Sequence, residues 1–144
     1  MIKIEYPPFE PKIRWETDKE FIFDEVRRQW VILTPEEWVR QNFLQYIIRV
    51  KGYPAPLIAV EKEIYLGELT KRFDIVVYDR NTNPWMIIEC KELNIGLDES
   101  VFNQVLRYNI NLQAAYVVIT NGAYCYAFVG KAGKFEALTE LPVF

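Results

Sequence analysis

Two apolar segments joined by a short polar turn constrain the fold of this chain more than any other feature of its sequence. The segments are Phe73–Tyr78 and Trp85–Lys91, and the turn Asp79–Pro84 contains the Asp, Asn and Pro residues that favour chain reversal. This pattern predicts an antiparallel pair of β-strands. Folding the chain about the middle of the turn places Asp74 opposite Glu89.

Strand alternation predicts where the charged residues of this pair point. Successive side chains along a strand point to opposite faces of a sheet. Phe73 and Ile75 are therefore expected on one face and Asp74 on the other. By the same rule, Glu89 and Lys91 share a face. In the predicted pairing, Asp74, Glu89 and Lys91 can all project to the same side.

Two carboxylates and a lysine within apolar strands require electrostatic compensation. Carboxylates about 5 Å apart across a sheet repel each other, and an unpaired buried charge costs several kcal/mol. A divalent cation compensates both carboxylates, and Mg²⁺ is usually held by one or two carboxylates together with water. Lys91 could then orient or help to deprotonate a water and stabilise charge developing on a phosphate. The spacing also allows a solvent-exposed strand end, with Lys91 in a salt bridge to Asp74 or Glu89.

Absent residue types narrow the chemistry further. The chain has no histidine, Ser100 is its only serine, and Cys90 and Cys125 are its only cysteines. A Ser-His-Asp triad, a Cys-His pair, a His-ligated metal and a closed thiolate zinc site are therefore excluded. The phosphate-binding motifs GxxxxGK[ST] and GxGxxG are also absent. The groups that remain for catalysis are carboxylates, lysines, tyrosines and an oxygen-ligated metal ion.

The remaining segments predict one mixed α/β domain over residues 1–144. A helix is expected at about 35–50, because Thr34 and Pro35 form a typical helix start, and another at about 98–112, capped by Asp98. Strands are expected at Ile13–Trp15, Phe21–Phe23, Trp30–Leu33, Leu57–Ile64, Phe73–Tyr78, Trp85–Lys91, Ala115–Thr120 and Tyr124–Val129. Residues 1–30 are expected to form an extended and hairpin lead-in, and residues 31–144 a core with a central sheet flanked by helices.

Asp74, followed on the next strand by Glu89-Cys90-Lys91, resembles the core motif of the PD-(D/E)xK nuclease superfamily. The longer context resembles the N-terminal nuclease domain of type I restriction enzyme R subunits and of short stand-alone proteins related to it. The matching segments occur in order along the chain: Leu33–Gln41, Lys71–Tyr78, Ile87–Lys91, Phe102–Gln104, Arg107–Asn109 and Thr120–Gly122. One departure is Phe73, which precedes Asp74 where the superfamily motif has proline.

This resemblance implies a restriction-endonuclease-like fold and Mg²⁺-dependent hydrolysis of DNA phosphodiester bonds, with Mn²⁺ as an alternative metal. It implies that Asp74 and Glu89 are metal ligands and that Lys91 is the catalytic lysine. It further implies that the 3′-oxygen leaves, giving a 5′-phosphate product. The restriction-enzyme relatives work with motor and specificity partners, and this chain has no motor segment. A homodimer or a partner protein is therefore expected to supply specificity.

Three acidic residues are candidates for the upstream acid that completes the metal site in this superfamily. Glu37 is the first candidate, although it also occupies a capping-box position, and Glu36 and Glu61 are the alternatives. Gln104 and Tyr108 lie four residues apart on the second expected helix and resemble the superfamily's Gln-x-x-x-Tyr element. They could hold a phosphate or the lysine amine, or they could be a surface amide and a core aromatic residue.

Several basic residues are candidates for a nucleic-acid-binding surface. Those on and near the first helix could line a nucleic-acid track or form a solvated face: Arg27, Arg28, Arg40, Arg49 and Lys51, with Trp38 and Tyr46 between them. By alternation, Arg72 is expected on the face of Asp74, where it would pair with that acid or with a phosphate, or else at a solvated strand entry. The formal net charge of −3 indicates modest, salt-sensitive affinity for nucleic acid.

The expected location is cytoplasmic, with no membrane partner. The N-terminus lacks a signal-peptide pattern, and no apolar run approaches the roughly 20 residues of a membrane helix. Both cysteines are expected to be buried, reduced thiols. The alternative function is a non-catalytic nuclease-like module that binds nucleic acid or a protein partner, and RNA stays open as a substrate.

Overall fold

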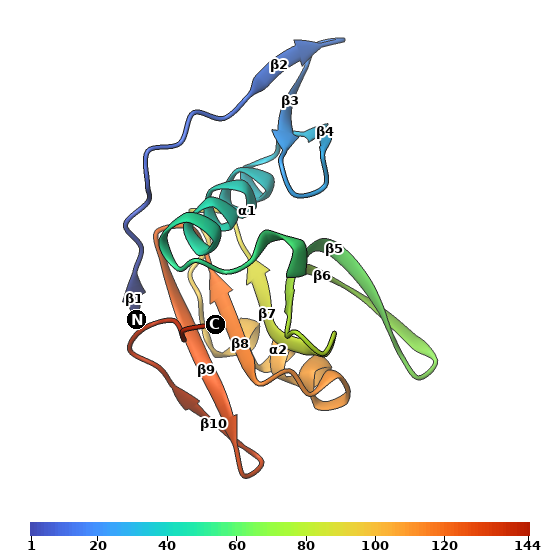
Figure 1. Ribbon diagram of the computed structural model, residues 1–144, viewed down its shortest axis with the longest axis vertical. Helices are drawn as coiled ribbons and strands as arrows, with labels where there is room; N and C mark the ends of the chain where they lie inside the picture. Colours follow the sequence, from blue (N-terminus) through green and yellow to red (C-terminus); the bar gives the residue numbers. More distant parts are fainter.

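A seven-stranded mixed sheet forms the centre of the structure (Figure 1). The computed structural model describes residues 1–144 except for the side chain of Asn111. The strands of this sheet are β1 (Ile2–Lys3), β5 (Ile58–Leu66), β6 (Leu69–Tyr78), β7 (Pro84–Cys90), β8 (Tyr116–Thr120), β9 (Tyr124–Lys131) and β10 (Lys134–Ala137). They are ordered β1-β9-β8-β7-β6-β5, with β10 also paired to β9, and only β7 and β8 run parallel. The predicted mixed α/β class is therefore confirmed.

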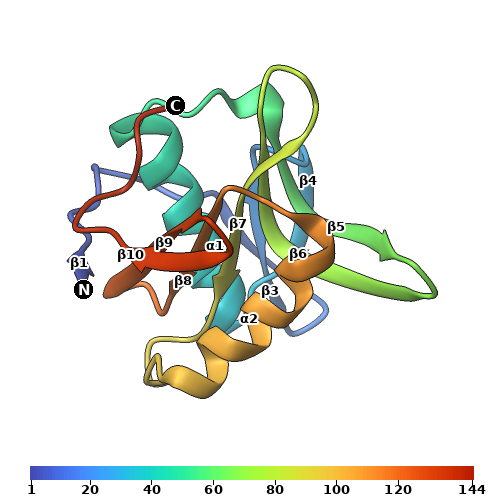
Figure 2. The same cartoon turned by 90° about the horizontal axis from the view of Figure 1, so that it is seen from below.

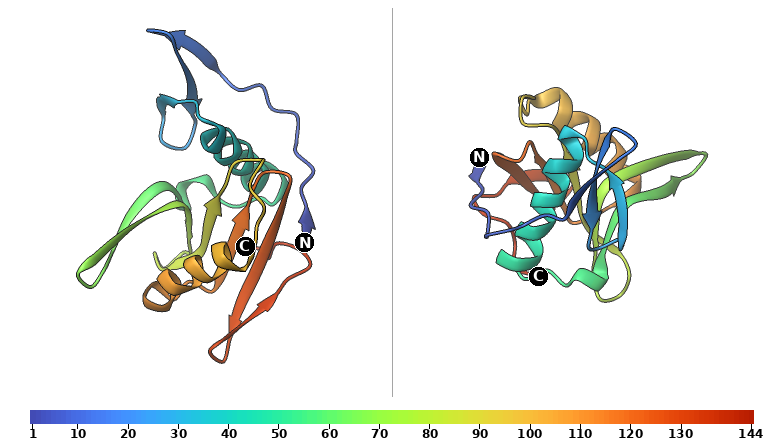
Figure 3. Two further views of the ribbon diagram at one scale, coloured as in Figure 1. Left: turned by 180° about the vertical axis from the view of Figure 1, so that it is seen from behind. Right: turned by 90° about the horizontal axis from the view of Figure 1, so that it is seen from above.

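Two helices cover opposite faces of the central sheet (Figures 2 and 3). They are α1 (Pro35–Gln45), which continues through the π-helical turn η1 (Tyr46–Val50), and α2 (Glu99–Leu112); a 3₁₀ turn, η2 (Ala55–Leu57), leads into β5. Thr34 caps α1 and Asp98 caps α2 by side-chain hydrogen bonds to backbone N–H groups, as predicted. Within the described residues, neither helix combines the length and the apolar content that crossing a bilayer would require.

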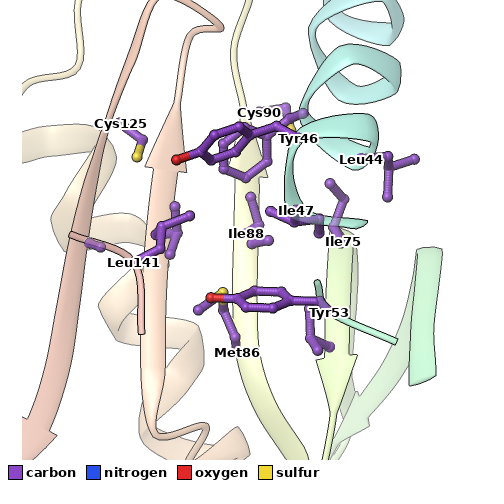
Figure 4. Close-up of a cluster of buried hydrophobic side chains, with 14 of the residues drawn as sticks. Leu44, Tyr46, Ile47, Tyr53, Ile75, Met86, Ile88, Cys90, Cys125 and Leu141 are labelled. Atoms are coloured by element: carbon purple, nitrogen blue, oxygen red, sulfur yellow. The ribbon is translucent and has the colours of Figure 1, made fainter. Parts of the chain in front are cut away.

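Two apolar clusters attach the helices to the sheet. On the α1 side, Figure 4 shows Ile47 close to Ile75 and Ile88, and all three side chains are fully buried. On the α2 side, Val105 packs in a cluster with Phe73. Each buried side chain of this size contributes roughly 1.5–3 kcal/mol. Both cysteines lie as buried free thiols in the α1-side cluster, as expected.

A second, three-stranded antiparallel sheet lies beside the start of α1 (Figure 1). It consists of β2 (Ile13–Glu16), β3 (Lys19–Asp24) and β4 (Gln29–Ile32), so the predicted hairpin and the third short strand are confirmed. The chain before it is more ordered than a simple lead-in, because Ile2 of β1 pairs with Cys125 of β9. Neither β1 nor β10 is predicted by the sequence pattern.

The pairing of β6 with β7 has the register expected from the turn between them. Ile75 is the partner of Ile88 in this antiparallel pair. Asp74 and Glu89 are therefore the next residues along the two strands, beyond the same end of the paired segment. This end of β6 and β7 is where the candidate site lies.

The alternation of side chains along β6 changes next to Asp74, contrary to prediction. Phe73 and Ile75 are expected on one face, but Phe73 packs on the α2 side and Ile75 on the α1 side. The facing strand β5 contains Glu61 in a left-handed conformation, with φ of 53°, where regular pairing with β6 is interrupted. Such an irregularity locally reorients a strand, so residues before and after Asp74 follow opposite alternations.

Candidate active site

Asp74 lies at the end of the paired part of β6 and β7 and bonds to groups from two elements. Its Oδ2 accepts a hydrogen bond from the backbone N–H of Cys90 at 2.8 Å, so the carboxylate itself links the two strands. Its Oδ1 accepts a hydrogen bond from Nη1 of Arg40 at 2.9 Å. The side chain is 14% exposed, which leaves it accessible from solvent.

Glu89 faces the α2 side of the sheet with one buried carboxylate oxygen that accepts no hydrogen bond from the described residues. Its Oε1 is buried and has no hydrogen-bond partner among the described residues, although Nζ of Lys71 lies 3.9 Å away. Burial, and then the negative charge of Asp74, raise the pKa of Glu89 to about 8, while the charges of Lys71 and Lys91 act in the opposite direction. Burial and the neighbouring acid therefore disfavour the charged form of the Glu89 carboxyl group.

A pocket of about 50 Å³ joins these strands to α2. Its walls are Lys71, Phe73, Glu89 and Lys91 from the strand side, and Val101, Gln104, Val105 and Tyr108 from α2. The backbone N–H of Lys91 donates to the carbonyl of Thr120 at 2.8 Å, which ties the start of the lysine side chain to β8. The structure therefore brings Glu89, Lys91, Gln104 and Tyr108 into one pocket, with Asp74 beside it.

A second lysine belongs to this pocket, and sequence alternation did not indicate it. Nζ of Lys71 lies 5.1 Å from the ring centroid of Tyr108, in addition to its approach to Glu89. Arg72, expected on the face of Asp74, instead pairs with Glu63 at 3.9 Å on an exposed part of the sheet. The change of alternation in β6 explains this exchange, because it turns Lys71 toward α2 and Arg72 away from it.

Glu37 is held in a buried ion-pair network. Its carboxylate accepts hydrogen bonds from Nε and Nη2 of Arg40 at 2.8 and 2.7 Å, from Arg27 at 3.0 Å and from Gln41 at 3.1 Å. Burial acts to raise its pKa, but these bonds and charges outweigh burial and lower it. Arg40 also bonds to Asp74, so Glu37 is linked to that acid through the guanidinium. Arg27 and Arg40 are therefore paired with acids within the protein and do not form an open track.

The three candidate upstream acids differ in their relation to the pocket. Glu61 pairs with Arg40 at 3.2 Å and, like Glu37, meets Asp74 through that arginine. Burial and then the charge of Asp74 raise the pKa of Glu36, while Lys91 and Arg40 act to lower it. Glu36 is thus the upstream acid whose charge acts on both Asp74 and Lys91. Among the described residues, no group of three or more acidic or cysteine side chains is gathered closely enough to hold an ion.

A larger, open hollow of about 560 Å³ lies on the α2 side, between the start of α2 and strands β8 and β9. Ile119, the β8 partner of Glu89, lines it, together with the tilted rings of Phe102 and Phe128, whose centroids are 3.9 Å apart. Its charged lining residues are acidic, Asp98 and Glu99, which disfavour a phosphate. The lysines of the smaller pocket make that pocket the better site for phosphate chemistry.

The fold and the site together define a mixed α/β protein with a carboxylate pair and two lysines at the end of its central strands. Residues 35–142 match the family model described as Type I restriction enzyme R protein N terminus (HSDR_N), and the chain belongs to this family. The match includes every residue of the pocket and all three candidate upstream acids. A comparison with curated proteins gave no match.

Proposed function

We propose that this chain is a metal-dependent endonuclease that hydrolyses DNA phosphodiester bonds. The family, described by the N terminus of a restriction enzyme subunit, supports a nuclease-related or restriction-related role. The observation that carries the proposal is the buried Oε1 of Glu89, which has no hydrogen-bond partner among the described residues and lies beside a second carboxylate and two lysines. An apolar sheet stabilises such a charge cluster poorly unless a further group binds there.

The donor set fits a hard divalent cation. Mg²⁺ takes oxygen ligands and is often bound by one or two carboxylates plus water, so Asp74 and Glu89 suffice as its protein ligands. Glu36 and Glu37 are both candidates for the upstream acid; Glu36 feels the charge of Asp74, and Glu37 is engaged by arginines. A bound Mg²⁺ or Mn²⁺ would supply positive charge that polarises a phosphate and activates water for attack.

The remaining pocket residues act on the phosphate and on water. The ammonium groups of Lys91 and Lys71 donate hydrogen bonds to a phosphate oxygen and stabilise the charge that develops there. The Gln104 amide and the Tyr108 hydroxyl supply further polar groups from α2 to fix the orientation of the substrate. In hydrolysis, a water oxygen bonds to phosphorus, and the sugar 3′-oxygen leaves and takes up a proton.

Plasmid cleavage tests this proposal. The native chain should convert supercoiled DNA to nicked or linear forms with Mg²⁺ or Mn²⁺, and EDTA should stop it. The cleavage rate of Lys91→Ala should be at least about 100-fold lower than that of the native chain. Lys131→Ala changes a 65% exposed lysine of β9 that is not part of the pocket, and it should cleave like the native protein. Equal cleavage by Lys91→Ala and the native chain would refute the assigned site.

A non-catalytic module is the second candidate, and one observation favours it. Arg40 already supplies a positive charge to Asp74 at 2.9 Å, so the site has an internal counter-ion. A module of this kind would bind DNA, RNA or a protein partner and cleave nothing. DNA binding without cleavage under either metal would decide for it and against the nuclease.

A further inference from the structure

The outward face of the small sheet combines aromatic rings with cations. We call this surface the aromatic–basic face; it consists of Lys12, Arg14, Phe21, Phe23, Trp30 and Ile32. Strand pairing puts these residues on one side, since Phe21 lies between Arg14 and Ile32 and Phe23 lies opposite Trp30. Lys12 joins the same row, because its carbonyl accepts the backbone N–H of Phe23 at 2.9 Å.

The opposite face of this sheet is buried only at its inner end. There, Ile22 and Asp24 are completely buried, whereas Trp15 at the outer end is 68% exposed. On the aromatic–basic face, Ile32 is 49% exposed and the rings of Phe23 and Trp30 are only half-buried. The aromatic rings therefore meet solvent where an ordinary small sheet would present polar side chains.

Each central ring is accompanied by a cation. The centroids of Phe23 and Trp30 are 5.4 Å apart, the guanidinium of Arg14 lies 4.3 Å from the Trp30 ring, and Nζ of Lys12 lies 5.6 Å from that of Phe23. Arg14 also pairs with Glu16 at 3.2 Å, but both side chains are about half exposed and such ion pairs are weak. A phosphate can therefore compete for Arg14.

We infer that the aromatic–basic face binds a single-stranded segment of nucleic acid. Bases stack on the rings of Phe23 and Trp30 or on the guanidinium plane of Arg14, and phosphates contact Lys12 and Arg14. A duplex keeps its bases stacked internally, so it would leave both rings unused. The inference rests on the proposed function, since the bound strand would be part of the substrate. The face precedes residues 35–142 and so lies outside the family match.

A continuous series of ion pairs connects this sheet to the site. Asp24 of β3 accepts a hydrogen bond from Nε of Arg27 at 2.6 Å, and Arg27 donates to Glu37 at 3.0 Å. Glu37 pairs with Arg40, which reaches Asp74 at 2.9 Å. Because all of these contacts are buried or partly buried, the small sheet is fixed relative to the pocket, and a strand bound on it has a defined position relative to Asp74.

Fluorescence anisotropy in EDTA tests this inference without cleavage. The probes are labelled oligo(dT) and oligo(rU) of about 15 nucleotides, and a DNA duplex of equal length. We expect single strands to bind more tightly than duplex, and Trp30→Ala to weaken binding about 5- to 100-fold. Lys12→Ala combined with Arg14→Ala should reduce the slope of log affinity against log salt by about 1.4. Trp15→Ala, at a 68% exposed tryptophan of the opposite face, is the matched control.

The outcomes separate the surface from the active site. Native affinity in both Trp30→Ala and the double variant, or a duplex bound as tightly as single strands, overturns the inference. The double variant alters exposed side chains, so it decides the matter even if Trp30→Ala does not fold. A relative preference for oligo(dT) or oligo(rU) identifies the nucleic acid. Plasmid cleavage without single-strand binding refutes the surface alone, and single-strand binding without cleavage refutes the nuclease alone.

Discussion

Replacing Glu89 by glutamine measures how much ionisation of this buried carboxyl group lowers the free energy of unfolding. Burial and Asp74 raise the pKa of this carboxyl group from 4.5 to about 8 in the folded chain. Between these values the folded chain binds more protons than the unfolded chain, so stability present below about pH 4.5 is lost as the pH rises through 8. At about 1.4 kcal/mol per pKa unit, full ionisation costs up to about 5 kcal/mol, and relaxation of the partly open site reduces this to about 2–4 kcal/mol.

The glutamine side chain has the shape of the protonated acid and cannot ionise. We therefore expect Glu89→Gln to match the native chain near pH 5 and to exceed its free energy of unfolding by about 2–4 kcal/mol near pH 8.5. Urea unfolding in EDTA measures this difference. Glu63→Gln, at a 48% exposed glutamate of β5, is the control and should stay within about 0.5 kcal/mol of native at both values.

The reasoning is tested by how the stability difference between Glu89→Gln and the native chain changes with pH. A constant difference between Glu89→Gln and the native chain at both pH values would mean that burial and Asp74 do not control the ionisation of this group. A variant that is less stable than native near pH 8.5 would mean that the ionised carboxylate is well compensated, although its Oε1 has no hydrogen-bond partner among the described residues.

Three further predictions follow from the same contacts. Mg²⁺ at about 100 times its Kd should stabilise the native chain by about 2.7 kcal/mol in thermal unfolding near pH 8.5, and Glu89→Gln by much less. Arg40→Met should cost about 3–5 kcal/mol in urea unfolding, because it leaves Asp74 without its buried partner; Arg72→Met, at an exposed pair, should cost under about 0.5 kcal/mol. Lys71→Met should raise the pKa of Glu89 further, as carboxyl NMR titration would detect; an unchanged pKa would exclude Lys71 as its partner.

The elements nearest the site could be predicted because local chemistry determines them. The polar turn and two apolar runs give the β6–β7 register, and the caps Thr34 and Asp98 give both helix starts. Gln104 and Tyr108 reach the pocket from α2, as their four-residue spacing and the family resemblance suggested. Their catalytic roles stay predictions.

Features that depend on distant segments could not be read from the sequence. The pairing of β1 with β9 joins residues more than a hundred positions apart, and two residues carry too little pattern to indicate a strand. The change of alternation at Asp74 depends on Glu61 of the neighbouring strand, so alternation does not indicate Lys71 in the pocket, and for Arg72 only the expected solvated strand entry agrees with the structure. The sequence predicts Arg40 on a nucleic-acid track or a solvated face, because only the folded chain brings Asp74 to it.

The hydrogen bond from the Cys90 amide to Asp74 gives this acid a structural role, the linking of β6 to β7, in addition to its proposed role as a metal ligand. A substitution that removes the acceptor at position 74 would leave the buried N–H of Cys90 without this bond, whether or not the chain hydrolyses a substrate. This structural constraint does not act on the head group of Lys91. Under the proposed function, retention of Lys91 is therefore a better marker of hydrolytic activity than retention of Asp74.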